Sequence, residues 1–230
     1  RYDIVTGGGT TTGHLTLDAI TISGVADTST LRLGGVGTGH VFVLAGAGEL
    51  TWNGTLSEDG GTWGGLNWTM GGDNTEFRAG DSAHFTAAAA NKAVEVTHGG
   101  VSAGNMVISA NGYTFTGGAI TATGGLTLAE DITATFDNDG LTVEGALTVQ
   151  GAEATLSVAE GKTVTISGTS TGGDLVVAGR GTVSISATGA VSNNVTVVDG
   201  SRLDLAASTS LDSGATLTLA GTLSLADGVT

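Results

Sequence analysis

The sequence contains no cysteine and no proline, and only 4% of its residues are aromatic. At average usage, a chain of this length would hold roughly eleven prolines. Their absence suits a fold in which most backbone N–H groups enter ladder hydrogen bonds, because proline lacks that donor. Strong helix formers such as Lys, Arg, Gln and Glu are also scarce. The sequence therefore predicts an all-β fold with a core of small and branched aliphatic side chains.

Positive charge is also scarce, with 7 Lys and Arg against 22 Asp and Glu and a net charge of −15. A nucleic-acid partner requires a basic surface, so this class is excluded. Charge-driven binding to anionic membranes is excluded for the same reason. No apolar run approaches the roughly 18 residues of a membrane helix. The acidity favours solubility outside the cell, and the lack of cysteine fits an envelope or secreted protein but equally the cytosol.

A repeat of about 20 residues runs through the C-terminal half of the chain. Its clearest copies are the alternating segments 163–166, 182–185, 202–205 and 222–225. A second series has apolar pairs at 156 and 158, 175 and 177, 195 and 197, and 215 and 217. A third, weaker pair is Val191 and Leu211. Several alternating strands within a period near 20 are typical of a solenoid.

Alternation places Val164 and Ile166 on one face of their strand and Thr163 and Thr165 on the other. One turn cannot bury its apolar face alone, but turns stacked about 4.8 Å apart share a continuous core. We therefore predict a right-handed parallel β-helix with turns of about 19–20 residues. Glycine and asparagine pairs suit the corners; they occur at 172–173 and 193–194.

The register extends toward the N-terminus with slips. The apolar pair 147 and 149 lies 17 residues before 164 and 166, and the pair 126 and 128 lies a further 21 residues back. The pair 31 and 33 precedes 50 and 52 by 19 residues, and 14–17 and 19–22 resemble earlier strands. We expect N-terminal β-helix turns over 1–52, a Gly- and Trp-containing excursion over 53–92 with an extra strand pair or a short helical turn, and regular turns over 93–230.

Residues 52–128 resemble the autotransporter-associated β-strand repeat of bacterial passenger domains. The resemblance rests on ordered aromatic and glycine landmarks: Trp52-Asn53-Gly54, Trp63, Asn67-Trp68, Gly80-Asp81, Phe85, Val94, Val96, 106–108, 112–114, Gly117-Gly118 and 119–121. It implies a β-helical passenger segment displayed outside a Gram-negative-type cell. The translocator barrel of such proteins is expected outside this sequence, and both ends of the sequence look cut.

Metal chemistry has little support. The four histidines, His14, His40, His84 and His98, show no ligand spacing. The segment 137–140, Asp-Asn-Asp-Gly, resembles part of a calcium loop, but Thr148 stands where the loop needs a glutamate. A corner turn is the alternative interpretation and the one we favour, because Asp, Asn and Gly suit turns. We assign no metal or cofactor.

Catalytic chemistry has equally little support. Three pairs of carboxylates could approach each other across stacked turns: Glu130 with Asp131, Glu153 with Glu160, and Asp199 with Asp204. Glycoside hydrolysis needs one protonated and one ionised carboxyl across a groove, and a lyase usually needs a nearby cation. The arginines at 180 and 202 fall in turns or on an outward row. Gly-x-Ser-x-Gly spacing occurs at 100–104 and 168–172, but nothing around it predicts the strand-to-helix turn of a nucleophile elbow. The glycines at 7–9 lack the lysine and helix of a phosphate loop.

Trp63 and Trp68 allow two interpretations. They would either stack on a sugar or anchor the packing of the excursion, and we favour packing because buried aromatic residues are few here.

Three functions follow. The first is a structural passenger or stalk segment of an exported bacterial surface protein, without catalysis. The alternative is an adhesin module that binds a glycan or a host surface protein, and a third hypothesis is a β-helical carbohydrate-active enzyme. We expect an extracellular or outer-membrane location, no catalytic residues, and end-to-end self-association through uncapped terminal turns.

Overall fold

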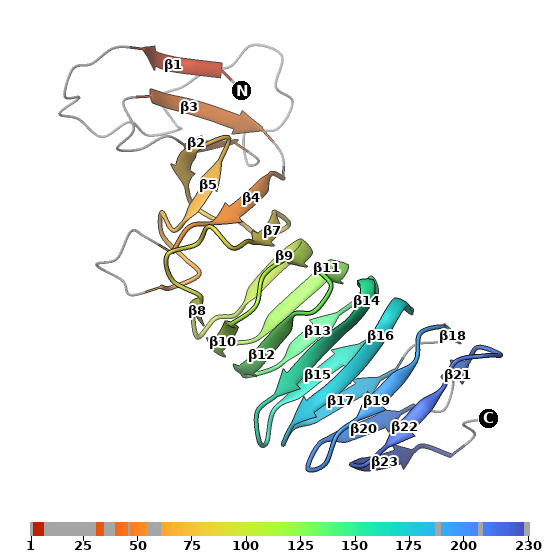
Figure 1. Ribbon diagram of the computed structural model, residues 1–230. Coiled ribbons are helices and arrows are strands. Elements are labelled where there is room, and N and C mark those ends of the chain that lie inside the picture. Colours follow the sequence, from red (N-terminus) through yellow and green to blue (C-terminus); the bar gives the residue numbers. More distant parts are fainter. Residues whose placement is uncertain are drawn as a thin grey trace.

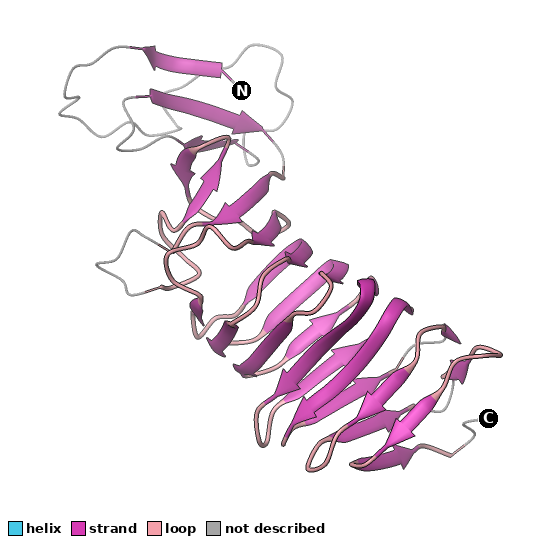
Figure 2. Cartoon of the chain, in the orientation of Figure 1, coloured by secondary structure: helices cyan, strands magenta, loops and turns pink. Residues whose placement is uncertain are grey.

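The computed structural model describes residues 2–6, 31–34, 40–45, 47–54, 61–186, 190–206 and 209–227. Every regular element in these residues is a β-strand, as Figure 2 shows. No described segment forms a helix long and apolar enough to cross a bilayer. The expected all-β class is confirmed.

The described strands number 23 (Figure 1). In chain order they are β1 (Tyr2–Thr6), β2 (Leu31–Gly34), β3 (His40–Ala45), β4 (Glu49–Trp52), β5 (Trp68–Met70), β6 (Asp73–Thr75), β7 (Ser82–Phe85), β8 (Ala93–Val96), β9 (Val101–Ile108), β10 (Tyr113–Gly117), β11 (Ile120–Leu128), β12 (Thr133–Asn138), β13 (Leu141–Val143), β14 (Ala146–Val158), β15 (Thr163–Ile166), β16 (Ser170–Gly179), β17 (Thr182–Ile185), β18 (Ala190–Val191), β19 (Val195–Val197), β20 (Arg202–Leu205), β21 (Ser210–Leu211), β22 (Leu217–Leu219) and β23 (Thr222–Leu225).

From β7 onward the strands stack in parallel, each on its equivalent one turn away, to give a β-helix of about seven turns. The stack has three parallel ladders. The first runs β8–β10–β12–β14–β16–β19–β22. The second runs β9–β11–β13–β15–β17–β20–β23. The third runs β4–β7–β9–β11–β14–β16–β18–β21, and long strands such as β14 bend to serve two ladders.

The clearest predicted repeat is confirmed residue by residue. In the second ladder, Val164 is level with Val183, and Leu203 is level with Leu223. The pairing of Val191 with Leu211 and the step of 21 residues between Leu126 and Leu147 are also confirmed. These inward side chains are almost fully buried until the last turn, where Leu223 is half-buried and Leu225 is 55% exposed. The threonines and Asp204 between them face outward, as expected.

Two register predictions are wrong, each because a corner is longer than the repeat suggested. Leu156 is level with Val177 rather than Leu175, and Val195 is level with Leu217 rather than Ala215. The 17-residue step from 147 to 164 is also wrong. Leu147 lies level with Ser170 in the third ladder, whereas Val164 lies level with Leu141 in the second.

The corners predicted at 172–173 and 193–194 are present. Gly172 lies in β16 between the parts of that strand that serve two ladders, and it has a φ of 98°. A Cβ at Gly172 would meet the carbonyl oxygen of Val149 at 2.0 Å, so this close approach of two backbones requires glycine. Asn193 fills the corner before β19 with a buried side chain that accepts a 2.9 Å hydrogen bond from Ser170 Oγ.

The described N-terminal strands differ from the parallel turns expected over 1–52. β3 pairs antiparallel with both β1 and β2, so the 19-residue step from Leu31 to Leu50 is not a turn. Only β4 joins the stack, where Leu50 lies level with Ala83 across the excursion. The strands expected at 14–17 and 19–22 lie outside the described residues. The extra strand pair expected in the excursion is the antiparallel hairpin β5–β6.

Candidate functional site

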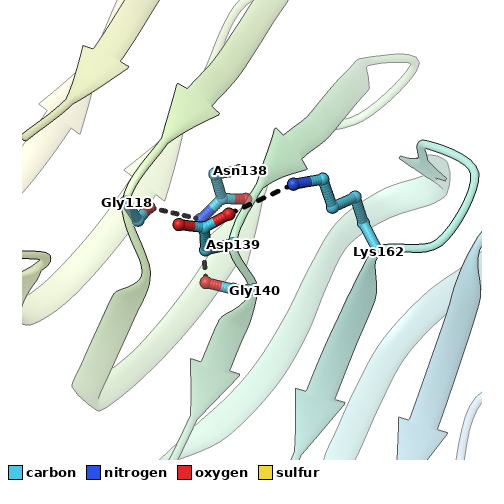
Figure 3. A network of polar contacts seen from close by, with 5 residues as sticks. All are labelled: Gly118, Asn138, Asp139, Gly140 and Lys162. Atoms are coloured by element: carbon cyan, nitrogen blue, oxygen red, sulfur yellow. Dashed lines mark hydrogen bonds and ion pairs between the residues drawn. The ribbon is translucent and has the colours of Figure 1, made fainter. Parts of the chain in front are cut away.

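The Asp137–Gly140 segment forms a corner that joins three turns (Figure 3). Asn138 is fully buried, and its Nδ2 donates to the carbonyl of Gly118 in the preceding turn at 3.2 Å and to that of Gly140 at 2.8 Å. Asp139 faces outward, where its carboxylate binds Lys162 Nζ of the following turn at 3.2 Å. The corner-turn interpretation is confirmed. The Asn138 amide links its own turn to the preceding one, and the Asp139–Lys162 ion pair links it to the following one. A surface ion pair of this kind contributes at most about 1 kcal/mol to stability.

Histidines with described side chains lie apart along the chain and in different surroundings. His84 is half-buried in β7, and His98 is exposed in the turn after β8. His14 lies outside the described residues, and only the backbone of His40 is described, in β3. Among the described residues, no group of three His, Asp or Glu side chains is arranged to hold a metal ion.

Among the carboxylates considered for catalysis, Glu130, Glu160 and Asp204 each contact a group other than the acid with which they were paired. Glu130 Oε1 accepts the backbone N–H of Ala152 at 3.1 Å. Glu153 lies within β14, whereas Glu160 lies in the turn that follows this strand and is paired with Arg180.

The two arginines near these acids already have partners. Arg180 Nη1 lies 4.0 Å from Glu160 Oε2, and both side chains are largely exposed. Arg202 Nε donates to Asp204 Oδ1 on the same strand. A cation that stabilises charge on a substrate has to be available to that substrate. Neither arginine faces a described cleft.

Sequence reasoning missed a recurring clamp at the start of first-ladder strands. Asn111 Nδ2 donates to the carbonyl of Asp131 at 2.8 Å, and its Oδ1 accepts from Thr133 N at 2.6 Å. Asn194 Oδ1 likewise accepts from Thr216 N at 2.9 Å, again 22 residues ahead. The only sequence signal is the shared spacing from an asparagine to a threonine. Both clamps bind one turn to the next and are structural.

The tryptophans of the excursion are packing anchors, as favoured. Trp63 and Trp68 are 1% and 0% exposed, and their ring centroids lie 5.0 Å apart. Trp68 Nε1 donates to the carbonyl of Trp63 at 2.6 Å, and Trp52 Nε1 donates to that of Asn91 at 2.7 Å. Phe85 packs against all three rings. An aromatic core thus fills the first turns, and aliphatic rows continue it.

A cleft of about 250 Å³ lies where the excursion meets the turn between β8 and β9. One group of wall residues comes from the loops around β5 and β6, and the other from the turn and the start of β9. The lining residues are Trp63, Gly64, Phe77, Ala79, Thr97, Gly100, Val101 and Ser102. None of them is titratable, so the cleft is apolar and hydroxyl-lined rather than charged. No periodic pattern marks it, which is why the sequence did not reveal it.

Comparisons with known protein families, with curated proteins and with solved structures give no significant match.

Proposed function

We propose that this chain is a rigid spacer or stalk segment of an exported bacterial surface protein, and that it carries no catalysis. One observation carries the proposal: a single buried core continues through about seven parallel turns. Each added turn extends such a stack by about 4.8 Å, with its backbone hydrogen-bonded on both sides. The geometry therefore provides length and stiffness.

Two further features support the proposal. Polar residues cover the outward positions, and the net charge of −15 opposes aggregation in a crowded extracellular layer. Residues 52–128 resemble the autotransporter-associated repeat, which would place the chain on the surface of a Gram-negative-type cell, with a translocator barrel as its export partner. Location on the surface is tested by protease treatment of intact producing cells, which should remove the chain; full protection would contradict it.

Spacer function is tested by deleting whole turns. Removal of residues 164–202 joins Thr163 to Leu203, which occupies the level of Val164 two turns further on. We expect a folded protein shorter by about 10 Å along the stack, measured by small-angle X-ray scattering. The matched control removes residues 164–192 and so breaks the register, which should abolish cooperative unfolding. Equal loss of structure in both variants would contradict a modular spacer.

The adhesin alternative is supported by the uncharged cleft at the excursion. The paired arginines do not favour the carbohydrate-active enzyme.

A further inference from the structure

The cleft between the excursion and the first regular turns combines an aromatic wall with a hydroxyl-bearing one. Phe77 is the half-buried ring of the aromatic wall, and it packs edge to face with the buried ring of Trp63, with centroids 5.2 Å apart. Thr97 and Ser102 contribute hydroxyl groups from the β8–β9 turn. An aromatic ring offers its face to apolar C–H groups, while hydroxyls both donate and accept hydrogen bonds. This combination suits a ring that is apolar on its faces and hydroxylated on its rim.

Charge and volume narrow the ligand class. A charged ligand would lose hydration in a cleft whose lining has no titratable group to replace it. The volume of about 250 Å³ is below the roughly 300–1,000 Å³ of drug-sized sites, so the cleft takes a single ring rather than a longer chain.

Three of the five buried polar atoms without partners lie in the excursion that forms one wall of the cleft. Among the described residues, five buried side-chain atoms have no hydrogen-bond partner: Trp63 Nε1, Asn67 Oδ1, Thr75 Oγ1, Asn138 Oδ1 and Asn193 Nδ2. The first three belong to the excursion. Trp63 is itself a wall residue, and Asn67 Nδ2 donates to the carbonyl of Gly64, another wall residue, at 3.5 Å.

We propose that this cleft binds one neutral, hydroxylated six-membered ring, the size of a monosaccharide unit at the end of a glycan. The ring face packs against Phe77, and the rim hydroxyls bond with Thr97 and Ser102. This binding goes beyond the spacer function and gives the adhesin alternative a specific site. The two are separable, because the deleted turns of the spacer test, 164–202, contribute no residue to the cleft.

The test uses the full chain and the methyl glycosides of glucose, galactose, mannose and N-acetylglucosamine, with glucuronate as the charged probe. Saturation-transfer NMR should detect at least one neutral glycoside, with a dissociation constant in the millimolar range as expected for one ring. Glucuronate should bind at least about tenfold more weakly. Absence of binding by every neutral glycoside at about ten times that concentration would overturn the proposal, as would a preference for glucuronate.

A blocking variant and a neighbour control locate the site. A side chain at Gly64 would start in open space, with only Thr97 Cγ2 within 4.0 Å, so Gly64→Leu fills the cleft without a clash. Gly99 lies next to the cleft, and a Cβ there would meet nothing within 4 Å, so Gly99→Leu is the control. We expect Gly64→Leu to weaken binding at least about tenfold while Gly99→Leu leaves it unchanged. Equal affinity in both variants, with native circular dichroism, would place the binding elsewhere and overturn the proposal.

Discussion

Asn111 holds Asp131 of the next turn in a backbone conformation that side chains rarely adopt. Its Nδ2 donates 2.8 Å to the Asp131 carbonyl, and the φ of Asp131 is 58°, the only positive φ among described residues other than glycine. Aspartate tolerates this left-handed region better than most residues, yet the conformation persists only where its surroundings fix it. The asparagine supplies that fixation through hydrogen bonds on both sides of its amide.

Replacing Asn111 should therefore destabilise the stack at this corner. Asn111→Ala removes the bonds to Asp131 and Thr133, and we expect the free energy of unfolding to fall by about 1–2 kcal/mol. Denaturant unfolding measures the change. Asn105→Ala, at an exposed position with no such clamp, is the control and should change stability by less than about 0.5 kcal/mol. Indistinguishable midpoints for the two variants would show that the clamp carries no stability.

Alternation in the second ladder is tested at two adjacent residues. Leu203 is 1% exposed in the inward row, whereas Asp204 faces outward beside Arg202. Leu203→Asp should cost several kcal/mol, because an unpaired carboxylate would enter a dry core. Asp204→Ser should change stability by less than about 1 kcal/mol, because it removes only a surface ion pair. Equal shifts in melting temperature would contradict the assigned faces.

Tyr113 makes stability depend on pH in the alkaline range. Its ring is fully buried, its hydroxyl donates to the Thr86 carbonyl at 2.6 Å, and burial raises its pKa to about 12. The folded state holds the proton more tightly than the unfolded chain, whose pKa is about 10. The stabilisation is therefore complete below pH 10, and up to about 3 kcal/mol is lost as the pH rises to about 12.

Phenolate absorbance tests this pKa in a Tyr2→Phe variant, which leaves Tyr113 as the one tyrosine. The titration midpoint should lie near 12 in the folded protein and near 10 in concentrated urea. Tyr113→Phe should lose the decline in stability between these values. A midpoint near 10 in the folded state would show that the phenol is not shielded.

The last described turn exposes leucines that inner turns bury. Leu211, Leu219 and Leu225 are 38%, 45% and 55% exposed, and their strands pair on one side only among the described residues. Such an edge is a template for another chain. We propose that copies associate end to end here. The net negative charge of each copy opposes this contact, so association should strengthen with salt, which shortens the Debye length to about 8 Å at physiological ionic strength.

Sedimentation across protein and salt concentrations measures this association, and hydrogen exchange on residues 216–227 measures fraying in the free copies. Leu225→Lys should suppress association, whereas Ser224→Lys, on the outward row, should not. A strict monomer at every concentration, with full protection of the last turn, would show that the edge is capped.

The sequence predicted the inward rows well, because burial on one face forces alternation at every turn. It failed where corners change length. A slip of two residues, as between Leu175 and Val177 opposite Leu156, keeps every side chain on its own face, so the apolar pattern cannot detect it.

Other failures have the same physical origin. Apolar and polar residues alternate in the same way in parallel and antiparallel strands. The pattern of Leu31 and Leu33 therefore could not predict that β2 pairs antiparallel with β3. The corner at Asn138 was predicted because Asp, Asn and Gly favour turns. The cleft was not, because loops far apart in the sequence bring Trp63, Phe77 and Ser102 together without any periodicity.

Parallel stacking is the central claim, and spin-label distances test it most directly. The outward row Ser102, Thr121, Thr142, Thr165, Ser184, Asp204 and Ser224 has one residue in each turn. Because the chain has no cysteine, labels can be placed in pairs at introduced cysteines. Backbone separations should rise by about 4.8 Å a turn, to about 14 Å for 121 with 184 and about 29 Å for 102 with 224. Separations that fail to grow with the number of intervening turns would contradict the β-helix.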